Sequence, residues 1–238
     1  MTPFKLALLT GASGGIGKEL QKQLKARGIP LIALSRKEAD LGTEEGKRSL
    51  FHILETKAPD LVINNAGFGL YGDTTSLSLE EQKQILLVNA LSVLEITQKA
   101  AQEMQRRKQK GVILNVSSVA GEFPTPGMAV YGASKAFVTQ FSQAMDYECA
   151  PFGVRILVSL PGQVSTHFAA KAAKKEVGIS KWAMSPAFAA KEILKQIDRR
   201  KQTHAFDWRY RGFLVLIRTL LPQKMVMKTI YNSLQERL

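Results

Sequence analysis

The stretch Thr10-Gly11-Ala12-Ser13-Gly14-Gly15-Ile16-Gly17 decides how this chain folds. It follows the short apolar run Lys5–Leu9 and leads into the amphipathic stretch 15–27, so it predicts a turn between a strand and a helix. Such a turn directs free backbone N–H groups and the positive end of the helix dipole at one point. Because glycine lets the backbone approach a phosphate closely, we expect a nucleotide pyrophosphate here, the alternative being a glycine-rich loop without a ligand.

Short apolar runs and longer amphipathic stretches alternate beyond this turn. The apolar runs that predict strands are Lys5–Leu9, Pro30–Leu34, Leu61–Ile63, Val112–Val116 and Val154–Leu160. The stretches with helical spacing are 15–27, 79–105 and 134–150. Parallel strands need a crossover of a dozen or more residues, so this alternation predicts a parallel sheet covered by helices on both faces.

The rest of the chain extends this domain without a visible linker, repeat or low-complexity tract, which predicts a single domain over residues 1–238. Ser185-Pro186 is typical of an N-cap followed by proline at the first helical position, and opens a helix to about Arg200. Ala205-Phe206-Asp207 is a candidate last edge strand. Residues 209–238 form a basic and apolar extension that Pro222 divides.

The charge of the chain is unevenly distributed. Its 238 residues carry 33 Lys and Arg against 20 Asp and Glu, a net charge of +13, of which +10 lies in residues 171–238. This asymmetry suggests a nucleic acid, a membrane surface or an anionic ligand as partner. We expect no nucleic acid, because no nucleic-acid-binding module is present and no aromatic residues alternate with the charges.

Sequence features also bound the compartment and the class of site. A single cysteine, Cys149, excludes a disulfide framework and a cysteine-rich zinc module, and fits a reducing compartment. The three histidines lack metal-ligand spacing. The apolar run Phe213–Ile217 is far shorter than the roughly 20 residues of a membrane span, and Leu6-Ala7-Leu8-Leu9 is too short for a signal core. We therefore expect a soluble, cytoplasmic protein.

Several further motifs stand in a fixed order along the chain. They are Asn64-Asn65-Ala66-Gly67, Asn89 in Val88-Asn89-Ala90, Ser118 in Asn115-Val116-Ser117-Ser118, Tyr131-Gly132-Ala133-Ser134-Lys135 and Pro161-Gly162-Gln163-Val164-Ser165-Thr166. With the Gly-x-x-x-Gly-x-Gly turn, they resemble the single-domain form of the short-chain dehydrogenase/reductase family over residues 4–168. The resemblance implies a three-layer, doubly wound Rossmann fold with a mostly parallel sheet of about seven strands. It also implies an NAD(P)-dependent oxidoreductase acting on CH–OH and C=O groups.

Tyr131 and Lys135 form the centre of the expected catalytic group. They are four residues apart and project from the same face of a helix, although this spacing is also common on solvated faces. A nearby ammonium group lowers the pKa of a phenol toward the range of efficient proton transfer. The resemblance implies that Tyr131 protonates the carbonyl oxygen, while Lys135 tunes the tyrosine and holds the nicotinamide ribose.

The resemblance adds two catalytic residues. Ser118, at the end of strand Val112–Val116, would donate a hydrogen bond to the substrate oxygen, and Ser117 is its rival by position. Asn89 would hold a water molecule for a proton relay to Lys135; the alternative is a helix asparagine bonded to a neighbouring carbonyl. The residues implied to contact the cofactor are Gly11, Ser13, Gly15, Ile16, Gly17, Arg36, Asp40, Asn65, Ala66, Gly67, Tyr131, Lys135, Pro161, Gly162, Val164 and Thr166.

The end of the second strand indicates which nucleotide is bound. Ser35 stands where NAD-binding proteins usually carry an acidic residue, and nothing in the sequence replaces that acid. Arg36 and Lys37 follow, and a guanidinium suits a 2′-phosphate, so NADP(H) is favoured over NAD(H). Asp40 would contact the adenine amino group, and the helix that the family usually places before it is trimmed to a turn.

The substrate loop is expected over about 163–184, with Trp182 and Met184 at its entrance or in surface packing. Its alanines and lysines fit an apolar pocket with a basic rim, suited to a hydrophobic carbonyl compound with an anionic group, such as a fatty-acyl thioester or a ketoacid, and also to other ketones. Asn65-Ala66-Gly67-Phe68-Gly69 and Lys135-Ala136-Phe137 resemble the branch of the family that reduces 3-oxoacyl or steroid-like ketones. The alternative function is a catalytically silent NADP(H)-binding sensor or scaffold. We expect a homodimer or homotetramer. The extension 209–238 could contact an anionic membrane, cap a neighbouring subunit's pocket, or be a solvated face, which is favoured.

Overall fold

A six-stranded parallel sheet forms the centre of the protein. The computed structural model describes residues 4–178, 183–219 and 221–235. The strands are β1 (Ala7–Thr10), β2 (Leu31–Leu34), β3 (Leu61–Asn64), β4 (Gly111–Val116), β5 (Val154–Leu160) and β6 (Thr203–Ala205), in the order β2-β1-β3-β4-β5-β6. The chain winds outward in both directions from the β1–β3 pair, so the sheet is doubly wound, as predicted.

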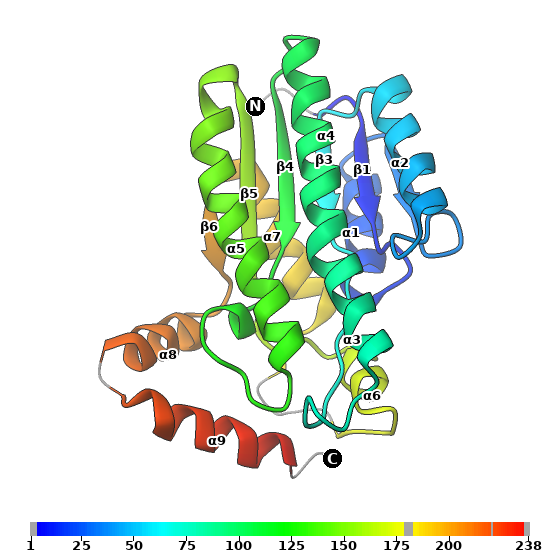
Figure 1. Cartoon of the computed structure of the whole chain (residues 1–238). Helices are drawn as coiled ribbons and strands as arrows, with labels where there is room; N and C mark the ends of the chain where they lie inside the picture. The colour runs from blue at the N-terminus through cyan, green and yellow to red at the C-terminus, as the bar shows by residue number, and fades with distance from the viewer. Residues whose placement is uncertain (1–3, 179–182, 220, 236–238) are drawn as a thin grey trace.

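Helices cover both faces of the sheet (Figure 1). The helices packed on one face are α1 (Gly15–Ala26) and α7 (Pro186–Arg199). Those on the other face are α2 (Glu44–Lys57), α4 (Ser92–Arg106) and α5 (Ala129–Cys149). A short helix α3 (Leu79–Leu86) and a π-helical turn η1 (Leu87–Leu91) lead directly into α4. The three-layer Rossmann prediction is confirmed.

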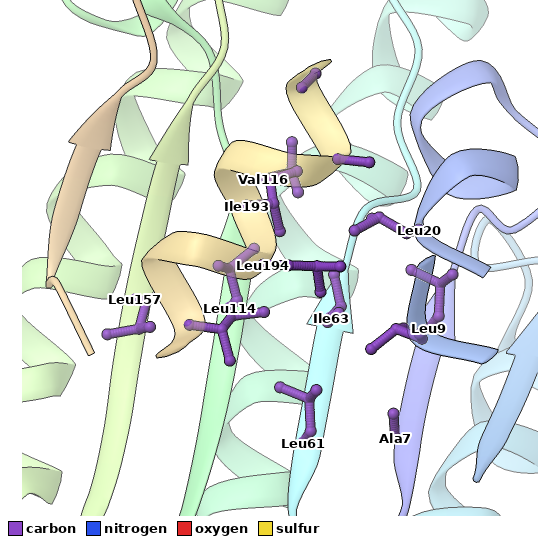
Figure 2. Packing of buried hydrophobic residues seen from close by; sticks show 14 of the residues in the cluster. Ala7, Leu9, Leu20, Leu61, Ile63, Leu114, Val116, Leu157, Ile193 and Leu194 are labelled. Atoms are coloured by element: carbon purple, nitrogen blue, oxygen red, sulfur yellow. The ribbon is translucent and has the colours of Figure 1, made fainter. Parts of the chain in front are cut away.

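Alternation along each strand produces two separate cores. Leu9, Ile63 and Leu114 face α1 and α7, where they meet Leu20 and Ile193 (Figure 2). Their neighbours along the strands, such as Leu8, Val62 and Ile113, face α2 and α4. Because both faces are buried, the strands are continuous apolar runs rather than alternating ones.

The structure corrects the predicted number of strands. About seven were expected, and the described residues form six. Residues 35–43 contain only turns between β2 and α2, which is too short for a crossover helix and a further parallel strand. The last strand is Thr203–Ala205 rather than Ala205–Asp207. Helix α2 was not predicted, although Thr43 caps it through the Gly46 N–H and two glutamates occupy its first turn.

Three further helices lie at the end of the sheet where the strands finish (Figure 1). They are α6 (Phe168–Ala173), α8 (Trp208–Thr219) and α9 (Gln223–Gln235). The last two are separated at Pro222, as the sequence indicates. None of the helices within the described ranges is long and apolar enough to cross a membrane.

Candidate active site

The glycine turn leaves no room for side chains. Gly11 has φ +66°, and a Cβ there would lie 2.7 Å from the Ala66 Cα. A Cβ on Gly17 would lie 2.2 Å from the Gly11 carbonyl oxygen, and one on Gly15 would lie 2.3 Å from Thr166 Cγ2. Helix α1 begins directly after this turn, and no side chain caps its first N–H groups. The turn is therefore a backbone cradle at a helix N-terminus, suited to a phosphate.

The segment after β3 fastens this cradle. Thr10 Oγ1 accepts hydrogen bonds from the backbone N–H groups of Asn65 (3.1 Å) and Ala66 (3.2 Å). The Asn65 amide donates to the carbonyl oxygens of Thr10 and Gly11, both at 3.1 Å. Asn65 and Ala66, both expected at the cofactor, thus lie against the glycine turn and hold its shape.

Tyr131 and Lys135 lie one turn apart on α5, and both are buried. The Lys135 Nζ donates to the Val116 carbonyl oxygen at 2.9 Å and lies 5.8 Å from the centre of the Tyr131 ring. Burial raises the pKa of Tyr131 to about 12, against the lowering effect of a hydrogen bond with Ser118. Desolvation thus outweighs the lowering that a nearby ammonium group was expected to cause, and the net shift of the Tyr131 pKa is upward. Burial also lowers the pKa of Lys135 to about 8.

The two serines after β4 have different surroundings. Ser117 Oγ donates to the Lys135 carbonyl oxygen at 2.7 Å and contacts Thr139 Oγ1 at 2.8 Å, so it belongs to the packing of α5. Ser118 lies beside the Tyr131 hydroxyl and accepts a hydrogen bond from the Ala120 N–H at 3.1 Å. Of the two, only Ser118 is placed to act with Tyr131.

Asn89 lies in the π-helical turn η1, fully buried. Its side chain pairs with both backbone groups of Phe68, donating to the carbonyl oxygen (2.8 Å) and accepting from the N–H (3.1 Å). A Cβ on Gly67 would lie 3.1 Å from Asn89 Oδ1 and 3.3 Å from Lys135 Nζ. A side chain at position 67 would therefore crowd both the Asn89 amide and the Lys135 ammonium group, whereas glycine leaves this space free. A π-turn is frequent at functional sites because it redirects a side chain.

The loop after β5 packs over the start of α1. Val164 pairs with Met184 as an isolated bridge, and Thr166 lies over Gly15 at the start of α1. Tyr210 of α8 covers Gly162, where a Cβ would lie 2.1 Å from the tyrosine ring, and its hydroxyl accepts a hydrogen bond from the Gln163 N–H at 3.0 Å. The Pro-Gly segment is thus held between the sheet and the C-terminal extension.

The turn after β2 contains an acidic group that sequence reasoning missed. The Ser35 N–H donates to Glu38 Oε2 at 2.8 Å, and the Ser35 hydroxyl donates to the same oxygen. The inference that nothing replaces the missing acid is therefore wrong. Arg36 is 86% exposed, and its Nε donates to Asp40 Oδ2 at 2.9 Å, so Asp40 already has a partner within its own turn. Only the Glu38-to-Ser35 spacing of three residues hinted at this contact.

Helices α6 and α9 cover the substrate side of Tyr131. Tyr131 shares a buried cluster with Tyr71, Met128, Ala172 and Leu234, and its ring centre is 5.4 Å from that of Phe168 in α6. The small cavity next to Tyr131, lined by Leu70, Leu77, Ile85 and Met128 among others, has room for about one water molecule.

Helix α9 therefore packs on its own chain. Leu234 and Ile230 belong to or border the Tyr131 cluster, and the Tyr231 hydroxyl donates to Asp73 Oδ1 at 2.7 Å. The expectation of a solvated face thus holds for the outer side of α9, where Lys224 and Lys228 are exposed, and not for its inner side. The side chains of residues 213, 214 and 216–219, like Trp182 as a whole, lie outside the described residues.

The three histidines and Cys149, to which the sequence assigns no catalytic or metal-binding role, lie apart from one another. His52 and His167 are exposed, whereas His204 is buried and pairs with Glu192 Oε2 at 2.9 Å. The described part of the chain contains no cluster of three or more potential metal ligands. Cys149 is buried at the end of α5, where burial raises the pKa of its thiol, which fits packing rather than nucleophilic attack.

Comparison with known proteins gives a consistent assignment. A family model described as short chain dehydrogenase matches residues 52–177. An uncharacterised oxidoreductase of Schizosaccharomyces pombe is 34% identical over 183 residues, covering 70% of this chain and 63% of that protein. The very-long-chain 3-oxoacyl-CoA reductase of Bos taurus is 30% identical over 227 residues, covering 84% of this chain and 70% of the bovine protein. The chain spans 63%, 52% and 52% of the length of the first three relatives.

Solved structures share the fold. A short-chain dehydrogenase from Sphingobium yanoikuyae in complex with NADPH has a TM-score of 0.76 and 24% identity, covering 92% of this chain and 98% of that one. A 4-hydroxyisoleucine dehydrogenase complexed with NADH has a TM-score of 0.76 and 23% identity, covering 85% of this chain and 97% of that one.

Proposed function

This chain belongs to the short-chain dehydrogenase/reductase family, and on that premise we propose that it is an NADPH-dependent oxidoreductase interconverting a carbonyl and an alcohol. One observation carries the proposal. The buried Tyr131, with Ser118 at its hydroxyl and Lys135 one turn away, lies at the same edge of the sheet as an uncapped glycine cradle. Such an edge, next to the switch point of a doubly wound sheet, is where ligands bind.

The residues present fit a dinucleotide. The positions where a Cβ would collide, Gly11, Gly15 and Gly17, form a cradle open to a pyrophosphate. Lys135 and Asn89 would hold the nicotinamide end, with Thr166 and Val164 closing the opposite side. When bound, NADPH supplies the hydride that is added to the carbonyl carbon.

Side chains of the protein would transfer the proton that the carbonyl oxygen needs. In reduction, the Tyr131 hydroxyl gives its proton to the carbonyl oxygen, while Ser118 donates a hydrogen bond that positions the same oxygen. The ammonium group of Lys135 stabilises the negative charge left on Tyr131. Asn89, which lies across Gly67 from Lys135, would hold a water molecule that returns a proton to the pair. In oxidation every step reverses.

The substrate that suits this site is apolar and elongated. Phe168, Ala172, Ile230 and Leu234 belong to or border the buried cluster of Tyr131, and Lys171, Lys174 and Lys175 are exposed on and after α6, where Lys174 pairs with Glu81. Long-chain 3-oxoacyl thioesters combine an apolar chain with anionic groups, and several relatives carry the name very-long-chain 3-oxoacyl-CoA reductase. We therefore place this substrate class first, ahead of simple ketones and steroid-like compounds.

Two exposed surfaces favour binding to a second copy of the chain and to a membrane. The apolar or aromatic side chains of Leu86, Leu91, Phe137 and Tyr147 are exposed on α3, η1 and α5, which favours pairing with a second copy of the chain. Trp208 and Met225, beside the exposed Arg211 and Lys224, favour contact of α8 and α9 with an anionic membrane surface.

NADPH oxidation over a panel of ketones and 3-oxoacyl thioesters tests the proposed activity directly. We expect turnover of at least one long-chain member of the panel and a preference for NADPH over NADH. Tight NADPH binding without turnover of any panel member would contradict the proposal and favour a nucleotide-binding sensor.

A further inference from the structure

The turn after β2 is organised around one carboxylate oxygen. Glu38 Oε2 accepts hydrogen bonds from both the N–H (2.8 Å) and the hydroxyl of Ser35, the first residue beyond the strand. The Lys37 N–H donates to Ser35 Oγ at 3.2 Å, and the Ala39 N–H donates to the Ser35 carbonyl oxygen at 3.0 Å. Because Ala39 is buried, the turn is fixed to the sheet while the Glu38 side chain remains exposed.

These contacts involve donors that a nucleotide phosphate would use. In a doubly wound sheet the adenosine ribose lies beyond the carboxyl end of the second strand, where Ser35 stands. A 2′-phosphate binds through N–H, O–H and guanidinium donors, and Ser35, Arg36 and Lys37 provide all three kinds of positive or hydrogen-bonding group. The Glu38 carboxylate already takes two of these donors, and it carries the same sign of charge as the phosphate.

We propose that Glu38 is a specificity-determining residue that holds the place of the 2′-phosphate and limits the preference for NADP(H) over NAD(H). The inference rests on the proposed use of a nicotinamide nucleotide. Arg36 and Lys37 attract the phosphate, whereas Glu38 must release Ser35 before the phosphate can bind there. A free 2′-hydroxyl imposes no such exchange, because it can donate to the carboxylate. The balance of the three side chains sets the ratio of the two affinities.

Binding measurements on Glu38 variants test the proposal without turnover. Kd values for NADPH and NADH are measured by calorimetry with wild-type protein, Glu38→Gln and Glu38→Ala. We expect the NADPH Kd to fall by about twofold to fivefold in Glu38→Gln, the size expected for one exposed charge interaction. The NADH Kd stays equal or rises. The effect should shrink at high salt, because exposed charges are screened.

A matched control separates local from general charge effects. Glu45→Gln removes the same charge from an exposed position in the first turn of α2 and should leave the ratio of the two Kd values unchanged. A ratio that is equal in wild type and both Glu38 variants overturns the proposal, as does an equal shift in Glu45→Gln. If the ratio shifts as expected while no carbonyl compound is reduced, the specificity role stands and the proposed activity fails. Absence of binding of either nucleotide overturns both.

Discussion

Burial moves the two titratable groups of the candidate active site in opposite directions. The pKa of Tyr131 rises to about 12, and that of Lys135 falls to about 8. The cause is the same, since a dry surrounding disfavours the charged form of either group. The phenol therefore keeps its proton, as a proton donor must, while the lysine changes charge close to neutral pH.

The pH dependence of carbonyl reduction should follow Lys135. A lysine with a pKa of about 8 is charged below that pH and neutral above it, so kcat/KM for reduction should fall as the pH rises through about 8. In Lys135→Arg the side chain stays charged, and any remaining activity should lack this limb. Profiles between pH 6 and 10 provide the measurement. A flat wild-type profile, or the same limb in both proteins, would contradict this role.

At the residue scale, the sequence indicated which side chains meet at the candidate site, but not all of the hydrogen bonds that they form. The motif positions Tyr131, Lys135, Ser118 and Asn89 converge at one edge of the sheet, as the resemblance implies for them. Glu38 was missed because its contact depends on a tight turn that brings residues 35 and 38 together. The pKa of Tyr131 could not be inferred either, since it depends on how completely α6 and α9 exclude water.

Among the elements, α9 contributes buried side chains to the cluster around Tyr131 although it lies far from Tyr131 in the sequence. Its residues Val226, Ile230 and Leu234 are spaced by four, so they share one face, and the last two reach the Tyr131 cluster. Leu234 lies against Gly127, at 3.2 Å from a Cβ built there. The Tyr231–Asp73 hydrogen bond fixes the end of the helix over the site. We expect α9 to form a wall of the substrate pocket.

Shortening a side chain on the inner face of α9 should change the choice of substrate. Leu234→Ala removes three carbon groups, each contributing about 0.8 kcal/mol when buried against the substrate, so KM for short ketones should rise by up to roughly 60-fold. The preferred chain length should move to longer substrates, which the enlarged pocket admits. Assays with ketones of increasing chain length measure both effects, and calorimetry should give an unchanged Kd for NADPH.

The outer face of the same helix offers the control for Leu234→Ala. Met225 is 51% exposed, and Met225→Ala should leave KM and chain-length preference unaltered. Equal effects of the two substitutions would show that α9 acts on folding rather than on the substrate.

Helices and strands were predicted correctly where the apolar residues or the cap follow a clear sequence pattern. The five predicted strands are short runs rich in Leu, Ile and Val, and β5 was predicted at its observed limits. The Ser185 cap of α7 was also readable, because serine before proline has a defined geometry. Helix α2 was missed because its apolar residues are confined to Leu50–Leu54, while its first turns are polar. The structure of residues 209–238 could not be predicted, because the inner face of α9 is buried against residues that lie far away in the sequence.

At the scale of the whole molecule, positive charge is concentrated in the last part of the chain. Residues 171–238 account for +10 of the +13 net charge; they span the end of α6, all of α7 on one face of the sheet, and α8 and α9 at one end of the sheet (Figure 1). Lys224 and Lys228 are exposed on α9, whose other face is buried against the body. Lys224 and Lys228 therefore lie on the outer face of a helix that covers Tyr131, where we expect an anionic thioester or an anionic membrane to be met.

Binding to lipid vesicles tests the membrane part of this arrangement. The protein should bind vesicles rich in phosphatidylserine, and lose binding as salt is raised. At about 1 kcal/mol for each basic residue near the surface, Lys224→Gln with Lys228→Gln should weaken binding by roughly tenfold or more. Sedimentation with vesicles of defined composition measures this.

Charge loss elsewhere serves as the comparison for the vesicle experiment. Lys22→Gln with Lys25→Gln removes the same charge from exposed positions on α1 and should leave vesicle binding unchanged. Equal binding to neutral vesicles, or equal loss in both double variants, would contradict a specific lipid-facing role for α9.

The most direct test of the proposed activity compares two tyrosines of α5 that differ in burial. Tyr131 is 8% exposed within the site, whereas Tyr147 is 87% exposed on the outer part of the same helix. With NADPH and a reducible long-chain carbonyl compound, Tyr131→Phe should lower kcat/KM by at least about 100-fold, the usual contribution of a general acid. Tyr147→Phe should retain wild-type kcat/KM. Wild-type turnover in Tyr131→Phe would contradict the account.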